Sequence, residues 1–434
     1  MTHDGTPAGD HARPAQESGP ALAPTAQSRR EPVLDLLRGA ALLGITLVNV
    51  QLMAGPAVFA LFTGDPLPDA GPGAPFIRAA VNLLATGKFV SSFSILFGLG
   101  AAMIALRAVD TVTRPGPLLA RRYGLLAVFG LAHMLLLFPG DVLFIYGLSG
   151  FVLLTFLRVR ARTALIWAVG LIVVSTVAFA GLTAAQAVWE AAPDPAWVAE
   201  VAQREAAALE AYAAGSLPGI LATNAFLAWW IQLDQMFALP WFLGLFLLGL
   251  AATRAGMVAD LAGHRPRLVR LAQVCLPIGL VLNLPQIVAS PETMSTGELS
   301  PGVAVLGAVA YTLGAPVLAV GYLAGLAVLG LDRGVDRGLR RRLAALGSIA
   351  LTGYLAQSAL ALLVFGGLRL YGRLGALGEL VVVVGIWTVL LLAAPWWTSR
   401  YRFGPVEWVW RSLTYGARPP LRRRPEQRPA GAPD

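Results

Sequence analysis

The stretch 33–53, VLDLLRGAALLGITLVNVQLM, constrains the fold of this chain more than any other. It is long enough to cross a lipid bilayer, since a spanning helix needs about 20 mostly apolar residues. It nevertheless contains Asp35, Arg38 and Asn49, and polar side chains inside a span are costly enough to be candidates for function. Arg38 and Asn49 lie 11 positions apart, and at about 100° per residue they return to nearly the same helix face. The stretch therefore predicts a spanning helix with one polar stripe.

The composition extends this interpretation to the whole chain. Of its 434 residues, 56% are hydrophobic and 13% are charged, and the mean hydropathy is +0.67. Soluble domains carry about 25% charged residues, so the composition predicts an all-α, polytopic membrane helix bundle. The net charge of +9 comes mostly from arginines beside apolar runs, which favours the phospholipid bilayer as partner and excludes nucleic acid. With Cys275 as the single cysteine, neither a disulfide framework nor a metal site is expected.

Apolar runs of spanning length recur along the chain and predict about ten transmembrane helices. Pro240 is expected to kink the sixth of them. Arginine clusters precede every odd-numbered span and follow the last one, so the positive-inside rule predicts that both termini are cytoplasmic. The predicted spans are 33–53, 77–106, 120–138, 141–157, 163–185, 220–253, 268–289, 303–331, 343–366 and 376–397.

Outside the spans, the sequence predicts two tails and two surface helices. Residues 1–31 and 418–434 are rich in Pro and small or charged residues, which is typical of disordered segments, so 32–417 forms a single membrane domain. The longest connection, 186–218, should contain a short helix after its Pro-Asp-Pro break. Tryptophans and arginines over 404–415 predict an interfacial helix, with Glu407 and Arg411 as a surface pair.

His133 is the histidine best placed for chemistry, because it lies within the third predicted span. Acyl transfer needs a base with a pKa near neutrality, which histidine supplies most readily. Asp141 follows the FPGD turn and is a candidate for the carboxylate that orients His133, while Asn49 is expected at a similar depth. The alternative is that His133 hydrogen-bonds a neighbouring group and only stabilises packing.

The remaining polar groups of the spans each allow two interpretations. Lys88, the single lysine, is suited to an anionic substrate or a coenzyme phosphate, or it pairs with Asp35 or Asp234. Arg38 either pairs with Asp35 within one turn or binds a phosphate through two hydrogen bonds. A further polar face on the ninth span either lines a substrate path or makes interhelical hydrogen bonds, and it consists of Tyr354, Gln357 and Ser358.

Three blocks of the sequence resemble a known family. They are LDLLRGAALLGITLVNV near the start, GKFVSSFSILFGLGA with LAHMLLLFPGDVLFIYGLSG in the first half, and ALTGYLAQS with FGPVEWVWRSLTYG near the end. Together they look like the YeiB-like bacterial membrane proteins, the domain-of-unknown-function 418 family. This resemblance implies a multi-pass protein of the bacterial plasma (inner) membrane.

The first block also resembles the first helix of a transmembrane acyltransferase superfamily. That resemblance implies an acyl transfer, with acyl-coenzyme A as the donor. The acyltransferase-3 proteins have a His eleven residues after the Arg of this motif, and Asn49 takes that position here. The heparan-glucosaminide N-acetyltransferase group has Asn there and an acetyl-accepting His in the following loop, but residues 54–75 of this chain contain no His. Neither histidine of those enzymes therefore carries over.

Three functions are compatible with these observations. The first is an acyltransferase-like enzyme that moves an acyl group across or at the membrane. The second is a transporter or exporter of a small or lipid-linked molecule, which long, Pro- and Gly-interrupted spans favour. The third is a non-catalytic membrane scaffold.

Overall fold

The structure is a computed structural model that describes residues 32–63, 71, 73–109, 115–189, 194–289, 300–332 and 337–423. Within these ranges the chain forms helices and one isolated β-bridge. The predicted tail 1–31 lies outside the described residues. The helices of the first half are α1 (Pro32–Met53), η2 (Pro56–Val58), α2 (Ala60–Thr63), α3 (Ala74–Leu84), α4 (Lys88–Val109), α5 (Pro115–Leu136), α6 (Leu143–Leu153), η3 (Leu154–Phe156), α7 (Ala161–Trp189) and α8 (Pro195–Ala214).

The second half is equally helical. Its helices are α9 (Leu217–Phe237), α10 (Leu239–Arg254), α11 (Arg265–Asn283), α12 (Pro285–Val288), α14 (Pro301–Val309), the π-helical turn η4 (Ala310–Gly314), α15 (Ala315–Leu331), α16 (Arg337–Ser348), α17 (Ala350–Leu362), the π-helical turn η5 (Leu363–Gly367), α18 (Ala376–Arg400) and α19 (Pro405–Tyr415). The all-α bundle expected from composition is confirmed.

Eight helical segments among the described residues are long and apolar enough to cross a membrane. A ninth is obtained when α9 and α10 are taken as one span, bent by 61° between them. This bend lies beside Pro240, so the kink expected there is confirmed. The fourth predicted span, 141–157, is different: its 11-residue helix α6 is followed only by the three-residue turn η3, so this segment is too short to be counted as a span.

The second and the ninth predicted spans are also each divided between two helices. The second consists of α3 and α4, and the chain turns between them at Gly87, whose φ of 84° favours glycine. The predicted span 343–366 is wrong at its start, because its first residues belong to the arginine-rich helix α16 and the membrane-length segment begins at Ala350. Charged residues at the start of α16 keep that helix near the end of the bundle rather than inside it.

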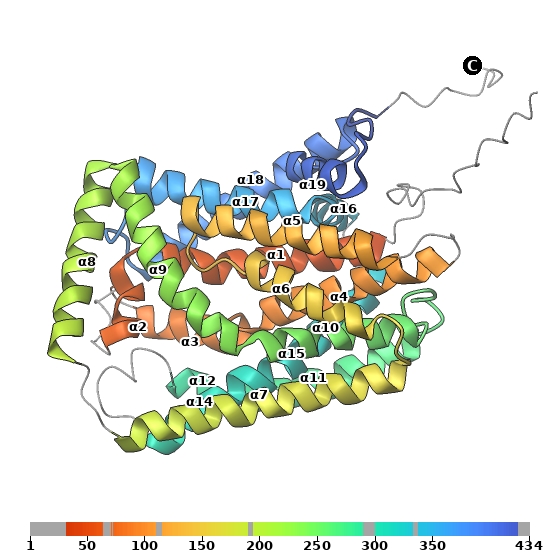
Figure 1. The fold of residues 1–434 in the computed structure, drawn as a ribbon, viewed down its shortest axis with the longest axis horizontal. Helices are drawn as coiled ribbons and strands as arrows, with labels where there is room; N and C mark the ends of the chain where they lie inside the picture. The colour runs from red at the N-terminus through yellow and green to blue at the C-terminus, as the bar shows by residue number, and fades with distance from the viewer. Residues whose placement is uncertain are drawn as a thin grey trace, which may run out of the picture.

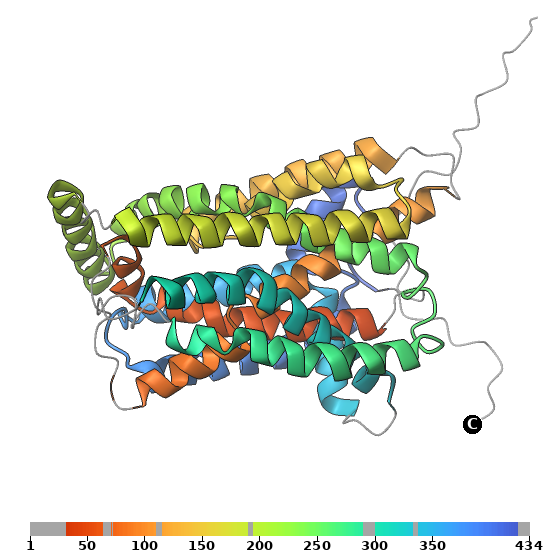
Figure 2. The same cartoon turned by 90° about the horizontal axis from the view of Figure 1, so that it is seen from below.

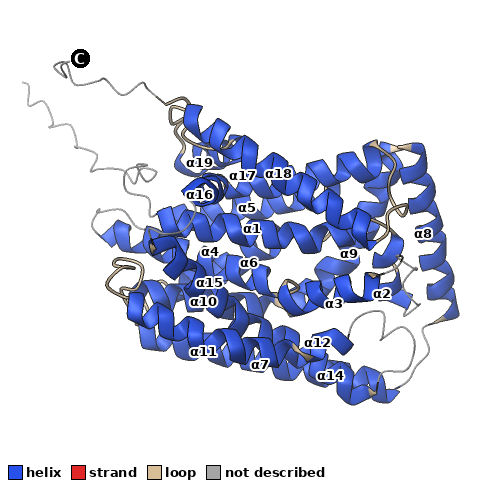
Figure 3. Cartoon of the chain, turned by 180° about the vertical axis from the view of Figure 1, so that it is seen from behind, coloured by secondary structure: helices blue, strands red, loops and turns tan. Residues whose placement is uncertain are grey.

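The long helices lie side by side along the longest axis of the molecule (Figures 1 and 2). At one end α8 crosses the bundle and packs on α9 and α2. Asp194 caps the start of α8, because its carboxylate accepts a hydrogen bond from the Ala196 amide (2.9 Å). The short helix expected in 186–218 is therefore present. The start of α1 lies near α16 and α19 at the opposite end of the bundle (Figure 3). Which end faces the cytoplasm stays a prediction.

The centre of the bundle is held by close packing of α4 against α10. Gly98 of α4 lies against the backbone of Phe246, and Gly249 of α10 lies against the backbone of the facing helix, so neither position has room for a side chain. The rings of Phe97, Tyr146 and Phe246 meet beside this crossing, with centroids 4.8 to 5.4 Å apart. These contacts position α4 and α6, which both contribute to the site described below.

The helix predicted over 404–415 is present as α19, and its place at the membrane interface stays a prediction, but the predicted tail begins too early. Residues 418–423 are described and return to the end of α18, where Tyr401 and Arg422 form an antiparallel bridge. The indole of Trp408 also donates a hydrogen bond to the Pro419 carbonyl (2.8 Å). These contacts attach the first residues of the basic tail to the domain.

Candidate functional site

His133 and Asp141 form a buried pair beside the turn that joins α5 to α6. Their side chains are fully inaccessible to solvent, and His133 Nδ1 lies 2.8 Å from Asp141 Oδ1. The second carboxylate oxygen accepts a hydrogen bond from the Phe144 amide (2.9 Å), which holds Asp141 at the start of α6. The sequence therefore placed the two residues together correctly, and their catalytic role stays a prediction.

The turn itself is not helical and is partly buried: Phe138 and Asp141 are buried, and Pro139 and Gly140 are half-buried. Its backbone groups are satisfied by side chains from other helices: Gln232 donates to the Asp141 carbonyl (2.9 Å), and Asn224 donates to the Leu135 carbonyl (3.4 Å). The Val142 amide donates to the Tyr354 hydroxyl (3.4 Å). Irregular backbone at membrane depth is tolerated only when protein surrounds it. This requirement explains why α6 is short, since the chain turns back inside the bundle.

The other ring nitrogen of His133 is unused. Nε2 is buried and has no hydrogen-bond partner among the described residues. The Tyr354 ring lies against the imidazole, with 4.9 Å between centroids. An imidazole with one nitrogen held by a carboxylate and the other free is the arrangement that a general base requires.

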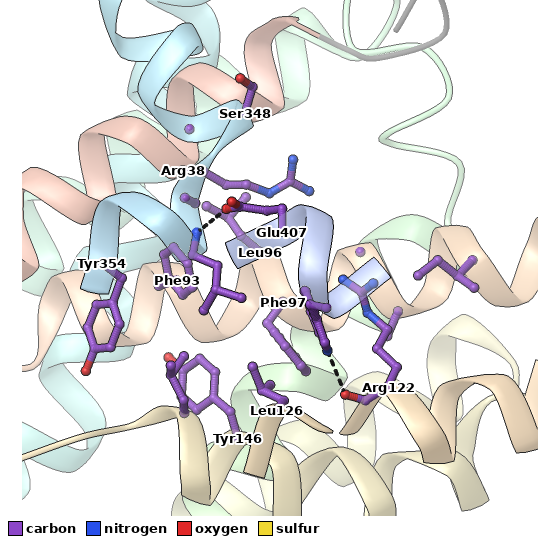
Figure 4. A pocket seen from close by; sticks show the side chains of 18 of the residues that line it. Arg38, Phe93, Leu96, Phe97, Arg122, Leu126, Tyr146, Ser348, Tyr354 and Glu407 are labelled. Carbon is purple, nitrogen blue, oxygen red and sulfur yellow. Dashed lines mark hydrogen bonds between the residues drawn. The ribbon is translucent and has the colours of Figure 1, made fainter. Parts of the chain in front are cut away.

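Tyr354 also lines a cavity of about 250 Å³ inside the helix bundle, which we call the main cavity because it adjoins the His133–Asp141 pair. Helices α1, α4, α5, α6, α16, α17 and α19 form its walls. Figure 4 shows Tyr354 at one side of this cavity, across from Arg38 and Arg122, with Phe93, Phe97 and Tyr146 between them. His133 is not among the described residues that line the cavity, so Tyr354 stands between the buried pair and the open space.

The side of the cavity away from Tyr354 is rich in cations. Arg38 Nη1 lies 2.7 Å from Asp35 Oδ1, so the pairing expected within one turn of α1 is present. The Arg38 side chain remains 24% exposed and lines the cavity, which leaves its other donors available. Arg122 stacks on Trp410 of α19, with the guanidinium carbon 3.6 Å from the ring centroid. Three guanidinium groups, those of Arg38, Arg122 and Arg411, thus line the same space, together with the carboxylates of Asp35 and Glu407.

Glu407 is buried and is not on the surface as expected. Its carboxylate accepts hydrogen bonds from the amides of Leu351 (2.7 Å) and Thr352 (3.0 Å) and from the Thr352 hydroxyl. It therefore caps the start of α17, where free amide groups and the helix dipole favour a negative charge. Through this cap, α19 positions the helix that carries Tyr354.

We expect Glu407→Ala to destabilise the protein by about 1–2 kcal/mol, the usual cost of losing an N-terminal cap. The thermal unfolding midpoint in detergent is the measurement. Glu200→Ala is the matched control, because Glu200 forms only an exposed pair with Arg204 on α8 and such pairs contribute little. Equal midpoints for the two variants would contradict the capping role.

The pairing of Lys88 with Asp35 or Asp234 is wrong. Lys88 is fully buried at the start of α4, and its Nζ donates to the Asn82 carbonyl (2.6 Å) and to Gln286 Oε1 of α12 (2.5 Å). Neutral oxygens therefore surround the ammonium group in the described part of the chain. Lys88 joins the break between α3 and α4 to α12, away from the main cavity.

Three other predicted polar residues, Asn49, Gln357 and Ser358, do not line the main cavity. Gln357 accepts a hydrogen bond from Thr46 of α1, and Ser358 donates to the Tyr354 carbonyl (3.5 Å), so both make contacts within or between helices. Asn49 is half-buried and, like these two, is not among the described residues lining the main cavity. Of the predicted cavity residues, only Asp35, Arg38 and Tyr354 line it.

Sequence reasoning missed Arg122, Tyr146 and Glu407 as cavity residues. Arg122 lies about two turns into α5 and directly follows Arg121. Nothing in the local sequence distinguishes it from the arginines that orient the spans. Among the described residues, no group of three His, Cys, Asp or Glu side chains is arranged to hold a metal ion.

Comparison with known proteins defines the family. Residues 252–417 match the family described as protein of unknown function (DUF418). The chain is 31% identical to the uncharacterized protein YxaH of Bacillus subtilis (strain 168), over 93% of this chain and 98% of the relative. It is 26% identical to the uncharacterized protein YeiB of Escherichia coli (strain K12), over 90% and 98% of the two chains. No solved structure matches the chain. The chain therefore belongs to the DUF418 family of YeiB-like proteins.

Proposed function

We propose that this protein is a membrane-embedded acyltransferase-like enzyme, with His133 as general base and the main cavity as the donor site. The observation that carries the proposal is the buried His133–Asp141 pair, whose free Nε2 lies behind Tyr354 at the wall of a cavity that also holds Arg38 and Arg122. An acyl thioester with phosphate groups, such as acyl-coenzyme A, matches a cavity that is apolar at its centre and cationic at one side.

The proposed reaction uses the pair as follows. Asp141 holds the Nδ1–H of His133, which leaves Nε2 with a free lone pair. Nε2 takes a proton from a hydroxyl or amine of the acceptor, whose oxygen or nitrogen then bonds to the acyl carbonyl carbon. The carbon–sulfur bond of the thioester breaks, and the leaving thiolate takes the proton from the imidazolium. Asp141 stabilises the transient positive charge on His133.

The reaction requires that Tyr354 moves. Its ring contacts His133 on one side and lines the cavity on the other, so a rotation of this side chain is needed to bring Nε2 to the acyl carbon. The Tyr354 hydroxyl accepts a long hydrogen bond from the Val142 amide (3.4 Å) and also hydrogen-bonds the Asp141 side chain. The rotation must therefore break both contacts.

The test is turnover of an acyl thioester by the purified chain in liposomes. We expect free thiol to appear in proportion to acylated acceptor when acyl-coenzyme A is supplied with a mixture of candidate hydroxyl and amine acceptors. An absence of both thiol release and acylated product across donors of different chain length would contradict the proposal.

We expect Arg38→Gln to raise the KM for the donor by about 10- to 100-fold with a smaller effect on kcat, because a charge-assisted hydrogen bond contributes about 1.5–3 kcal/mol. The measurement is the initial rate against donor concentration. Since the change leaves Asp35 without its partner, the double variant Asp35→Asn with Arg38→Gln is the control for that charge. Arg265→Gln on the exposed start of α11 should leave KM unchanged.

A transporter is the second candidate, and the interrupted helices favour it. The break between α3 and α4 meets the break between α11 and α12 at Lys88, and α9 and α10 are bent by 61°. Discontinuous helices that meet inside a bundle are common at transporter binding sites. The liposome assay separates the two functions, because a transporter would accumulate a labelled acceptor unchanged and release no thiol.

A further inference from the structure

A second cavity, of about 450 Å³, lies beside the same end of α1, apart from the site described above. It is formed where the start of α1, the end of α15 and the first turns of α16 meet. We call it the α1–α16 pocket, and it is lined by Pro32, Val33, Leu36, Gly330, Arg337, Arg340, Arg341 and Ala344. Three arginines therefore face a floor of small and apolar side chains.

One of these arginines is held in place by the protein. Arg340 Nη1 donates to the Asp332 carbonyl (2.6 Å), and Nη2 donates to the Gly330 carbonyl. These carbonyls belong to the end of α15, where unpaired oxygens and the helix dipole favour a cation. Arg340 thus has a structural role, and it fixes α16 against α15.

The other two arginines have no such role. Arg337 and Arg341 lie four residues apart on one face of α16, and both are exposed. Neither forms an ion pair with a residue that the structure describes. Two neighbouring guanidinium groups repel each other unless an anion lies between them, and their planar donors match phosphate oxygens.

The position of the pocket at the ends of two membrane-length segments indicates which kind of anion it meets. The membrane-length segments Pro32–Met53 and Pro301–Leu331 begin and end beside it, and the ends of spans mark the level of lipid headgroups. Other arginines at span ends, such as Arg265 and Arg267, are equally exposed but line neither cavity. A general preference for positive charge on one side of the membrane explains arginines there, but it does not explain a pocket with an apolar floor.

We propose that the α1–α16 pocket binds an anionic phospholipid, whose phosphate is held by Arg337 and Arg341. The apolar floor, which includes Val33, Leu36 and Ala344, covers the glycerol and the first carbons of the acyl chains. The proposal is independent of the acyltransferase function, because none of these residues contributes to the main cavity.

The test measures lipid binding by the full chain in uncharged detergent micelles, with added phosphatidylglycerol or phosphatidylcholine. We expect Arg337→Gln with Arg341→Gln to weaken phosphatidylglycerol binding by about 30-fold, at roughly 1 kcal/mol for each basic residue beside an anionic lipid. Phosphatidylcholine binding should not change. Arg265→Gln with Arg267→Gln removes the same charge from exposed sites on α11 and should leave phosphatidylglycerol binding within about twofold of the wild type.

Each contrary result has a distinct meaning. An equal loss in the two double variants would show that net charge, and not the pocket, attracts the lipid, and would overturn the proposal. Inorganic phosphate that displaces phosphatidylglycerol at equal concentration would assign the pocket to a soluble anion instead. Unchanged lipid binding after Arg337→Gln with Arg341→Gln would also overturn it, and because both side chains are exposed, loss of folding does not confuse the result.

Discussion

His133→Gln is expected to lower the rate of acyl transfer by about 10²- to 10⁴-fold, the usual contribution of a general base. Glutamine can still donate a hydrogen bond to Asp141, so the buried carboxylate keeps a partner, but its amide has no lone pair basic enough to accept the acceptor proton. The decrease should therefore appear in kcat, while the KM for the donor stays within a few-fold of the wild type. The measurement is thiol release in liposomes.

His264→Gln is the matched control, because His264 lies on the surface near the start of α11 and should leave the rate unchanged. Asp141→Asn should lower kcat in the same direction as His133→Gln, since the amide no longer stabilises the imidazolium. Thermal midpoints of all variants separate a catalytic loss from unfolding. Full activity of a well-folded His133→Gln variant would remove His133 from the mechanism and leave only a packing role.

Gly98→Ala is expected to destabilise the protein more than Glu407→Ala does. A Cβ at this position would lie inside van der Waals contact of the Phe246 carbonyl, so the added methyl group must push α4 away from α10. Overpacking of this kind costs about 1–3 kcal/mol, and more where backbone faces backbone. Because α4 also carries Phe93 and Phe97 of the main cavity, the displacement should lower both the thermal midpoint and the fraction of protein that remains monodisperse in detergent.

Gly170→Ala is a matched control within a spanning helix. Nothing lies within 4 Å of a Cβ at Gly170 on α7, and alanine favours helix over glycine by about 1 kcal/mol. We therefore expect an unchanged or slightly higher midpoint. If Gly98→Ala and Gly170→Ala shift the midpoint equally, the close crossing of α4 and α10 is not a determinant of stability.

The prediction of spanning helices succeeded where one apolar run forms one helix. The first span, the kink beside Pro240 and the helix after the Pro-Asp-Pro break are all encoded by local sequence, namely apolar length and proline geometry. The pairing of Asp35 with Arg38 belongs to the same class, because both residues lie on one turn of α1.

The failures have a different physical origin. Glu407 looked like a surface residue because its own helix is amphipathic, but its carboxylate caps α17, at amides that lie 55 and 56 residues earlier in the chain. Lys88 was expected to meet an anionic substrate or to pair with Asp35 or Asp234, and instead two neutral oxygens from α3 and α12 accept hydrogen bonds from it. The partners of Glu407 and the Gln286 partner of Lys88 come from helices that are distant in sequence, and no local pattern specifies them.

The sequence alone determined that this chain is an all-α membrane bundle, because apolar length and the need to satisfy backbone hydrogen bonds in lipid leave little other choice. It also determined the polar stripe of α1 and singled out His133 and Asp141. Only the tertiary structure decided that the turn after α5 lies inside the bundle, that Tyr354 stands between His133 and the main cavity, and that Arg122 joins Arg38 there. These arrangements depend on contacts between helices far apart in the chain, since each buried polar group takes the nearest partner that packing provides.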